Sequence, residues 1–297
     1  MQINLKGISI VVLGGDARSL AMMEDLTASG AVVNAAGMPA DVIPAGVHYF
    51  SEPEACLAGA GAVILPVPGM SEKGYLHSPL AAQPLAFTED LAARFPPGIP
   101  VFVGVAGPAL AKIAANSGLR LIELMKMNEV AILNSIPTAE GAVQMAMEML
   151  PITIHGSCAF VLGFGRTGAT LARLLGSMGA RTMVAARRPE YLARITELNL
   201  TPVPFADMPH YLDEADVIFN TVPVPVLTGE VLEKVHPGTL IIDLASAPGG
   251  VDFQRAESIG VKAVLAPGLP GKVAPKTAGR ILAKVVIRLL HEEMAGN

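Results

Sequence analysis

The sequence has no tryptophan, only two cysteines and few charged side chains, which make up 16% of its 297 residues. Cys56 and Cys158 are too few for a disulfide framework, so we expect buried thiols in an intracellular protein. Lysine and arginine form no run and the net charge is −5, which argues against a nucleic-acid partner. The apolar run at residues 8–13 is too short for a signal peptide or a membrane span. These absences predict a soluble, cytoplasmic protein.

Two kinds of catalytic site also lack their sequence patterns. The six histidines are scattered, without the spacing of a zinc site, and no G-x-S-x-G segment is present. We therefore expect no metal ion and no serine hydrolase chemistry.

Apolar residues, in contrast, are abundant at 52%, and strand-like runs alternate with helical segments. This alternation predicts parallel sheets covered by helices on both faces. The length suggests two domains. We expect an α/β protein of two Rossmann-like doubly wound domains, with an interdomain cleft and a C-terminal helix that returns to the first domain. The expected strands are residues 8–13, 31–35, 62–66, 101–105, 120–124, 159–162, 181–186, 216–221, 239–244 and 261–266.

The most informative stretch is the glycine pattern that follows the apolar run 159–162. Gly163 permits a tight turn, Gly165 lets the backbone approach a pyrophosphate, and Gly168 lets the next helix pack on the sheet. The N-terminus of that helix offers N–H groups to the anion. The segment predicts a dinucleotide site.

The end of the second strand of this domain indicates which dinucleotide binds. A carboxylate there would hydrogen-bond a ribose diol, but the chain has Arg187 and Arg188 instead. Guanidinium groups form charged, fork-shaped contacts with phosphate oxygens, which favours NADP over NAD. The expected cofactor contacts are Gly163, Gly165, Arg166, Thr167, Gly168, Arg187, Arg188, Asn220, Thr221, Pro223 and Ser246.

A helix that begins at Pro137 is expected to connect the domains. The predicted division is an N-terminal substrate domain of residues 1–136 plus 275–297, a connecting helix of residues 137–150, and an NADP-binding domain of residues 151–274.

Ser135 and Thr138, at the start of the connecting helix, are candidates to hold a substrate carboxylate, and ordinary helix capping is the alternative. The cationic candidates for that role are Arg18, Lys272 and Lys276. Ser135 and Lys276 are also the candidate catalytic residues.

Eight segments together resemble a known family. They are residues 14–18 (GGDAR), 134–141 (NSIPTAEG), 154–157 (IHGS), 163–168 (GFGRTG), 192–197 (LARITE), 243–250 (DLAS and PGG), 265–271 (LAPGLPG) and 273–279 (VAPKTAG). They resemble the family of dipicolinate synthase A subunits, which are the dehydrogenase subunits of that enzyme. The second half is more distantly similar to D-2-hydroxyacid and alanine dehydrogenases.

The resemblance implies an oxidoreductase that uses NADP to oxidise a dihydrodipicolinate-level intermediate to dipicolinate. It also implies a role in sporulation, in the mother-cell cytoplasm, with the flavoprotein-like B subunit of dipicolinate synthase as partner, and we expect a homo-oligomer as well. Two alternatives stay open: an NADP-dependent dehydrogenase of another small carboxylic acid, and a non-catalytic NADP-binding regulatory subunit.

Overall fold

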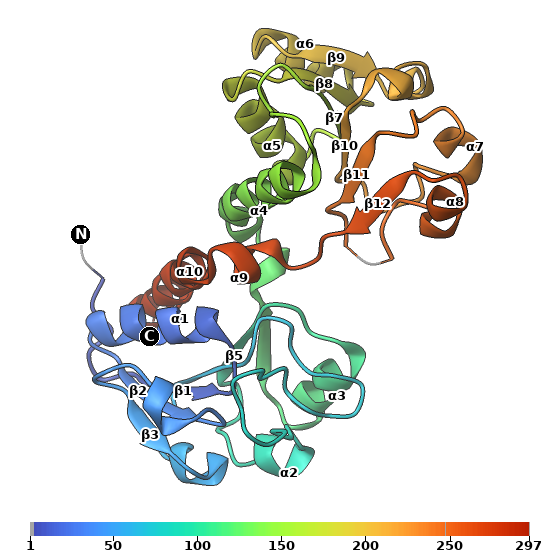
Figure 1. The fold of residues 1–297 in the computed structure, drawn as a ribbon. Helices are drawn as coiled ribbons and strands as arrows, with labels where there is room; N and C mark the ends of the chain where they lie inside the picture. Colours follow the sequence, from blue (N-terminus) through green and yellow to red (C-terminus); the bar gives the residue numbers. More distant parts are fainter. Residues whose placement is uncertain (1–2, 247, 297) are drawn as a thin grey trace. The chain divides into compact units, whose positions relative to one another are not determined.

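The computed structural model describes residues 3–246 and 248–296. The chain forms two compact units, each built on a six-stranded parallel sheet. Unit 1 consists of Met1–Leu133 and Ala274–Asn297, and unit 2 of Asn134–Val273. The strand orders are β3-β2-β1-β4-β5-β6 and β12-β11-β10-β7-β8-β9, and each order reverses direction once, as in doubly wound sheets. The predicted α/β class is therefore confirmed (Figure 1).

Unit 1 has a hydrophobic core on each face of its sheet. Along β1, Ile10 and Val12 belong to one core, which they share with helices α1 and α10, while Val11 and Leu13 belong to the other. This alternation follows from the two-residue period of a strand. The elements of unit 1 are β1 (Ser9–Leu13), α1 (Ala17–Ala28), β2 (Val32–Ala36), β3 (His48–Phe50), β4 (Ala62–Ile64), α2 (Glu89–Ala92), β5 (Pro100–Val103), α3 (Pro108–Asn116), β6 (Arg120–Glu123) and α10 (Pro275–Gly296), with 3₁₀ turns η1 (Ala40–Val42), η2 (Pro53–Cys56) and η3 (Leu124–Lys126).

Unit 2 repeats the arrangement around β7. Ala159 and Val161 belong to the core shared with α5 and α4, whereas Phe160 and Leu162 belong to the core on the opposite face. The elements that lie in unit 2 are β7 (Cys158–Leu162), α5 (Arg166–Ser177), β8 (Arg181–Ala186), α6 (Pro189–Glu197), β9 (Thr201–Pro204), η4 (Met208–His210), η5 (Leu212–Glu214), β10 (Val217–Asn220), α7 (Gly229–Leu232), β11 (Leu240–Asp243), α8 (Phe253–Ser258), β12 (Lys262–Leu265) and α9 (Leu269–Val273).

Helix α4 (Asn128–Met149) differs from the prediction. It begins at Asn128 instead of Pro137, so Pro137 lies inside the helix, more than two turns from its start. An interior proline removes one backbone hydrogen bond and is normally disfavoured, which is why the sequence suggested a helix start there. Here Val130, Ala139 and Ala142 are fully buried along the helix, and burial of this apolar face outweighs the local penalty.

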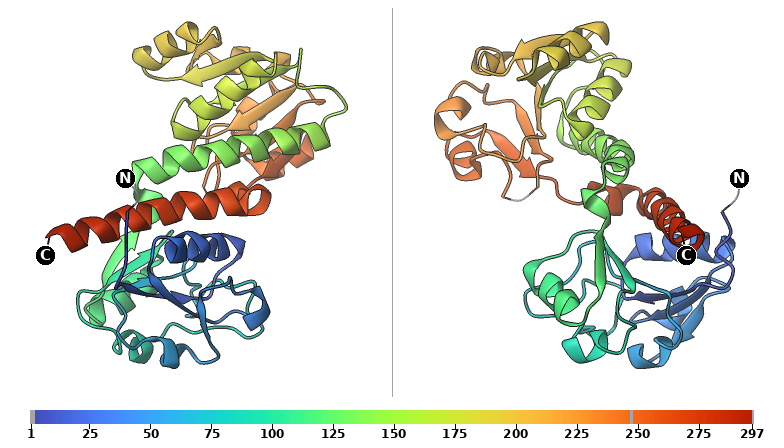
Figure 2. Two further views of the ribbon diagram at one scale, coloured as in Figure 1. Left: turned by 90° about the vertical axis from the view of Figure 1, so that its left-hand side faces the viewer. Right: turned by 180° about the vertical axis from the view of Figure 1, so that it is seen from behind.

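Helix α10 packs against α1, as expected for a C-terminal helix that returns to the first domain. Figure 1 shows the two helices side by side, and Figure 2 shows the same pairing from two other directions. The contact is close at Gly279, where an added Cβ would lie 2.3 Å from the carbonyl oxygen of Arg18. Gly279 therefore sets how near α10 comes to the first turn of α1.

Strands β3 and β9 and helix α9 are absent from the sequence prediction. Both strands are at the edge of their sheets, and β9 contains Pro202 and Pro204, which sheets tolerate at an edge. Helix α9 contains Pro270 and Gly271, and this pair of residues is typical of a turn or loop, so the sequence did not indicate a helix there. Among residues 3–246 and 248–296, no helix has the length and apolar character that a membrane crossing requires.

Candidate functional site

The turn between β7 and α5 has the geometry that its glycines predict. Gly163 has φ of +98°, and an added Cβ would meet the Thr221 hydroxyl at 2.6 Å. A Cβ on Gly168 would lie 2.1 Å from the carbonyl oxygen of Gly163, so the helix touches the strand at this point. Around Gly165, by contrast, no described atom lies within 4 Å of an added Cβ. Gly163 and Gly168 are therefore packed against neighbouring atoms, whereas the backbone at Gly165 is accessible to a ligand.

The N-terminus of α5 adjoins this opening. Gly165 is the N-cap and supplies no capping side chain, so the first turn has no side-chain acceptor there. Arg166 is exposed and Thr167 is half-buried in that turn. A helix start of this kind favours an anion through its N–H groups and its dipole.

Residues at the end of β10 pack against the glycine turn and hydrogen-bond to the end of β7. The Thr221 hydroxyl donates a 2.8 Å hydrogen bond to the carbonyl oxygen of Leu162, so it fastens β10 to the end of β7. Asn220 is fully buried, and its amide donates to Asp243 at 2.8 Å and to the carbonyl oxygen of Val222 at 3.1 Å. Both residues were predicted cofactor contacts. The hydrogen bonds of their side chains shape the end of β10 beside the glycine turn, and their contact with a cofactor stays a prediction.

Asp243 organises the next loop. One carboxylate oxygen accepts from Asn220 and from the N–H of Ala245, and the other accepts from the N–H of Gly250 at 2.7 Å. Three donors compensate for the burial of this carboxylate. Pro223 and Ser246, the other predicted contacts in these loops, are exposed at the same carboxyl edge of the sheet.

The end of β8 carries the two predicted arginines, and both are exposed. The guanidinium of Arg187 lies 4.9 Å from the ring centroid of Phe205, and that of Arg188 lies 5.4 Å from the ring of Tyr191. Stacking of this kind orients each guanidinium. Both side chains are exposed, and the guanidinium of Arg188 also lies 3.8 Å from the carboxylate of Glu190. Together with the glycine turn, they surround a pocket of about 200 Å³, lined by Gly163, Phe164, Ala185, Ala186, Arg187, Arg188, Tyr191, Phe205 and Val222.

The predicted anion site at Ser135 and Thr138 is wrong as a helix start. Both residues lie inside α4, where backbone N–H groups bond within the helix. Thr138 donates its hydroxyl to the carbonyl oxygen of Asn134 at 2.8 Å, and the Ser135 hydroxyl is 2.7 Å from that of Thr170. Ser135 is 1% exposed. Both hydroxyls therefore form hydrogen bonds inside unit 2, and the catalytic role of Ser135 stays a prediction.

The two predicted lysines belong to different units. Lys272 is exposed on α9 of unit 2, and Lys276 is exposed at the start of α10 in unit 1, where its ammonium lies 3.6 Å from Glu24.

Arg18, in contrast, is held rigidly. It lies in the first turn of α1, and its Nε and Nη2 donate to the carboxylate of Asp16, at 2.6 Å for the shortest contact. The Arg18 side chain is only 12% exposed. Burial raises the pKa of the Asp16 carboxyl. The hydrogen bonds and charge of Arg18, together with a smaller effect of His77, outweigh the effect of burial, so the pKa lies below its ordinary value.

A second pocket, of about 580 Å³, lies in unit 1 within the loop that follows β4, since all the residues that line it fall in the range 68–85. Its lining includes Tyr75, His77 and Ser78. The Ser78 hydroxyl accepts from the N–H of Gly15 at 3.0 Å and donates to the carbonyl oxygen of Gly37 at 3.1 Å. Neither His77 nor Ser78 belongs to a local sequence motif, and only the folded loop brings them to the ends of β1 and β2.

Two family models match the chain, one in each half. Residues 9–125 match the N-terminal domain of the dipicolinate synthase A subunit, and residues 131–248 match the NAD binding domain of D-isomer specific 2-hydroxyacid dehydrogenases. Unit 2 is therefore a nicotinamide dinucleotide-binding domain of the dehydrogenase type.

Relatives match over nearly the full length. The chain is 40% identical to the dipicolinate synthase A subunit of Bacillus subtilis over 98% of each chain. The crystal structure of the corresponding protein from Bacillus halodurans superposes with a TM-score of 0.93 at 39% identity, over 97% of this chain and 99% of that one. An L-alanine dehydrogenase structure superposes with a TM-score of 0.69 at 17% identity, over 96% and 89%, which shows a shared fold.

Proposed function

The chain belongs to the family of dipicolinate synthase A subunits, and from this membership we propose that it is the dehydrogenase subunit of a dipicolinate synthase. In this proposal it oxidises a dihydrodipicolinate-level intermediate to dipicolinate with NADP⁺, in the mother cell of a sporulating bacterium. It acts with the flavoprotein-like B subunit and itself forms a homo-oligomer. The observation that carries the redox chemistry is the open glycine turn at the start of α5 in a dehydrogenase-type domain.

The residues present fit the cofactor. The open side of Gly165 leaves room for a pyrophosphate against the backbone, and the uncapped start of α5 offers N–H groups to it. Arg187 and Arg188 would hold the 2′-phosphate, because each exposes N–H groups beside the pocket at the end of β8. When bound, the nicotinamide supplies the hydride acceptor.

The substrate is a dicarboxylate in this proposal, so the protein must offer donors to two anionic groups. Arg18 is the first candidate, because Asp16 fixes one edge of its guanidinium. Its Nη1 donates no hydrogen bond to any residue in the described part of unit 1. The exposed Lys272 and Lys276 are candidates for the second carboxylate.

A turnover assay tests the function. The chain, alone and with the B subunit, is mixed with NADP⁺ and dihydrodipicolinate, and formation of NADPH and dipicolinate is followed. Turnover excludes a purely regulatory, NADP-binding role, and comparison with other small carboxylic acids tests the substrate. Absence of dipicolinate under both conditions would overturn the proposal.

The cofactor preference is tested by replacing the arginine pair. Arg187→Asp with Arg188→Ser is expected to reverse a preference for NADP⁺ over NAD⁺, because each lost charged hydrogen bond costs about 1.5–3 kcal/mol. Arg194→Ser is the matched control, since Arg194 is exposed on α6 and pairs with Glu197. Titrations of both nucleotides give the ratio of dissociation constants. Equal affinity of the unaltered chain for both nucleotides would contradict the assignment.

A further inference from the structure

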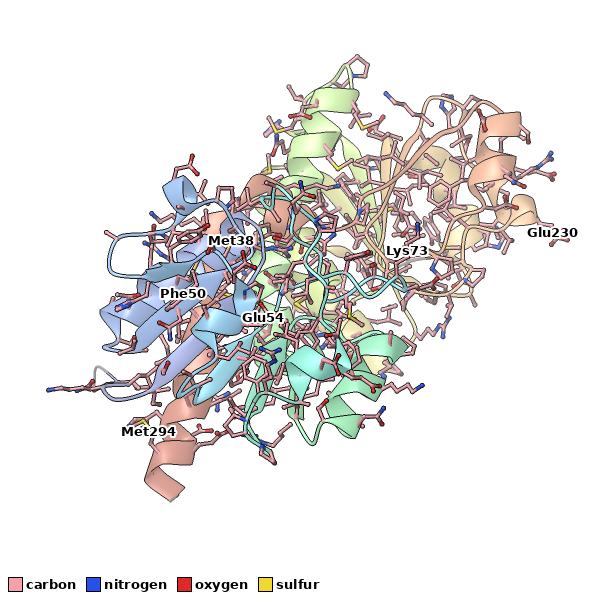
Figure 3. All side chains as sticks on the ribbon, turned by 90° about the horizontal axis from the view of Figure 1, so that it is seen from below. Met38, Phe50, Glu54, Lys73, Glu230 and Met294 are labelled. Carbon is pink, nitrogen blue, oxygen red and sulfur yellow. The ribbon has the colours of Figure 1, made fainter. Side chains whose placement is uncertain are left out.

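The loop between β4 and α2 folds into a fixed structure over the carboxyl ends of β1 and β2. Two antiparallel bridges order it, Met70 with Leu76 and Tyr75 with Ala86. Lys73, labelled in Figure 3, lies in the exposed turn between the paired segments. An added Cβ on Gly14 would lie 3.0 Å from the Ser78 side chain, so the loop and the β1–α1 turn are in direct contact.

This loop places His77 beside the Asp16–Arg18 pair. The neighbouring residue Ser78 is hydrogen-bonded to Gly15, which immediately precedes Asp16. The N–H of His77 donates to the carbonyl oxygen of Gly69 at 3.0 Å, which fixes the backbone from the other side. His77 contributes to the lowered pKa of the Asp16 carboxyl, so the two side chains lie near one another.

The pocket within the loop has room for a small ring. Pro68, Met70, Leu76 and Leu85 are among its apolar lining residues, and its volume of about 580 Å³ falls within the range of small-molecule sites. The lining side chains with polar groups are Ser71, Tyr75, His77, Ser78 and Gln83. Ser78 already bonds to the backbone of the neighbouring turn. Of these groups, only an imidazole readily takes up a proton near neutral pH.

We propose that His77 is the catalytic base that accepts the proton when a substrate bound in this pocket is oxidised. The inference rests on the proposed function and adds the proton acceptor to it. The dihydropyridine ring loses one hydrogen with its electron pair to NADP⁺ and a second as a proton to the imidazole. The products are the aromatic dicarboxylate, NADPH and the imidazolium, so atoms and electrons balance.

The charged groups near His77 determine the net charge of the site when the imidazole accepts a proton. The charged groups beside it are Asp16 and Arg18, at the start of α1, and Tyr75 shares the pocket. The charges of Asp16 and Arg18 cancel each other, so the site carries one net positive charge when His77 becomes an imidazolium during turnover. Oxidation therefore requires neutral His77, and kcat is expected to rise with pH as the imidazole loses its proton.

Two variants of His77 test the proposal in the full chain, with the B subunit present. His77→Gln is expected to lower kcat at least about 100-fold, the usual contribution of a general base, and to abolish the rising limb of the pH profile. Dipicolinate binding, measured by calorimetry, is expected to stay within about threefold. His77→Gly is expected to regain activity when imidazole is added. His48→Gln, at the exposed edge strand β3, is the matched control and should behave like the unaltered chain.

The outcomes separate the two proposals. If the unaltered chain forms dipicolinate and His77→Gln retains kcat within about twofold with the same pH profile, His77 is not the base. The same conclusion follows if kcat falls but imidazole restores nothing to a folded His77→Gly chain. If the unaltered chain forms no dipicolinate even with the B subunit, the proposed function itself is wrong, and the role of His77 falls with it.

Discussion

At the residue scale, the proposed chemistry depends on three glycines in one turn and on one histidine that a long loop brings to the ends of β1 and β2. Gly163, Gly165 and Gly168 lie within one short segment, so their roles follow from local backbone geometry. His77 reaches the ends of β1 and β2 through a folded loop, and a lone histidine in a loop has no pattern to reveal it. The helix start predicted at Pro137 was wrong for the converse reason, because the local signal of a proline is overridden by the buried face of α4.

Gly165→Val tests the open side of the turn. The added side chain meets no described atom within 4 Å of its Cβ, so the fold should survive, but it occupies the space where a pyrophosphate would lie. We expect NADP⁺ binding to weaken more than about 100-fold, with an unchanged melting temperature. Gly168→Ala is the contrasting variant, because its Cβ would lie 2.1 Å from Gly163 and should lower the melting temperature. Undiminished NADP⁺ binding by Gly165→Val would move the site elsewhere, with Gly14 and Gly15 the next candidates.

Arg18→Ala tests the substrate contact. Loss of one charged hydrogen-bonding group should reduce kcat/KM by about 1.5–3 kcal/mol, roughly ten- to hundredfold, and leave NADP⁺ titrations unchanged. Lys276→Ala should act in the same direction if that lysine holds the second carboxylate. Arg120→Ala is a suitable control, since Arg120 forms an exposed ion pair with Glu293 in the same unit. Normal steady-state kinetics in both Arg18→Ala and Lys276→Ala would mean that other groups hold the substrate.

At the scale of elements, the apolar runs of the sequence predicted the central strands of both sheets. Helix boundaries and edge strands were harder to predict from the sequence. The central strands are short apolar runs that are buried on both sides, which sequence shows directly. Strand β9, with two prolines, and helix α9, with a proline and a glycine, form because their neighbours in the fold stabilise them. Local propensity alone argues against both.

Gly279→Ala tests the packing of α10 on α1. A glycine-to-alanine change inside a helix usually stabilises it by about 1 kcal/mol. Here the new Cβ would lie 2.3 Å from the carbonyl oxygen of Arg18 and 2.8 Å from the Cβ of Ala21, so the two helices must move apart. The substitution should therefore destabilise the protein instead of stabilising it. We expect a lower melting temperature and weaker substrate binding, with NADP⁺ affinity unchanged. Lys284→Ala, on the exposed side of α10, is the control. A stabilised Gly279→Ala chain would show that this contact is not close in solution.

At the scale of the whole molecule, the two units have separate hydrophobic cores. Among the described residues, no core cluster of buried side chains draws members from both units. The alternating pattern predicted this two-part α/β architecture, because each half contains enough strands for a complete doubly wound sheet. How the chain is divided follows instead from long-range packing, above all that of α10.

Separate cores predict separate responses to the cofactor. NADP⁺ at 100 times its dissociation constant should stabilise unit 2 by about 2.7 kcal/mol and leave unit 1 unchanged. Differential scanning calorimetry should therefore show two transitions, of which one shifts upward with nucleotide. The Gly165→Val chain should show the same two transitions without the shift. A single transition that moves as a whole would indicate that the units unfold together.

The pairing of α10 with α1 has a consequence for biosynthesis. Unit 2 is one continuous segment, so all of it has been translated before α10. Leu282, Val286 and Leu290 of α10 complete the core that includes Met22 and Met23 of α1. Until these residues emerge, the nascent N-terminal half exposes that apolar surface, and at roughly 5–20 residues per second the interval is on the order of ten seconds. Chaperones that bind exposed apolar helices can act on the N-terminal half during this interval.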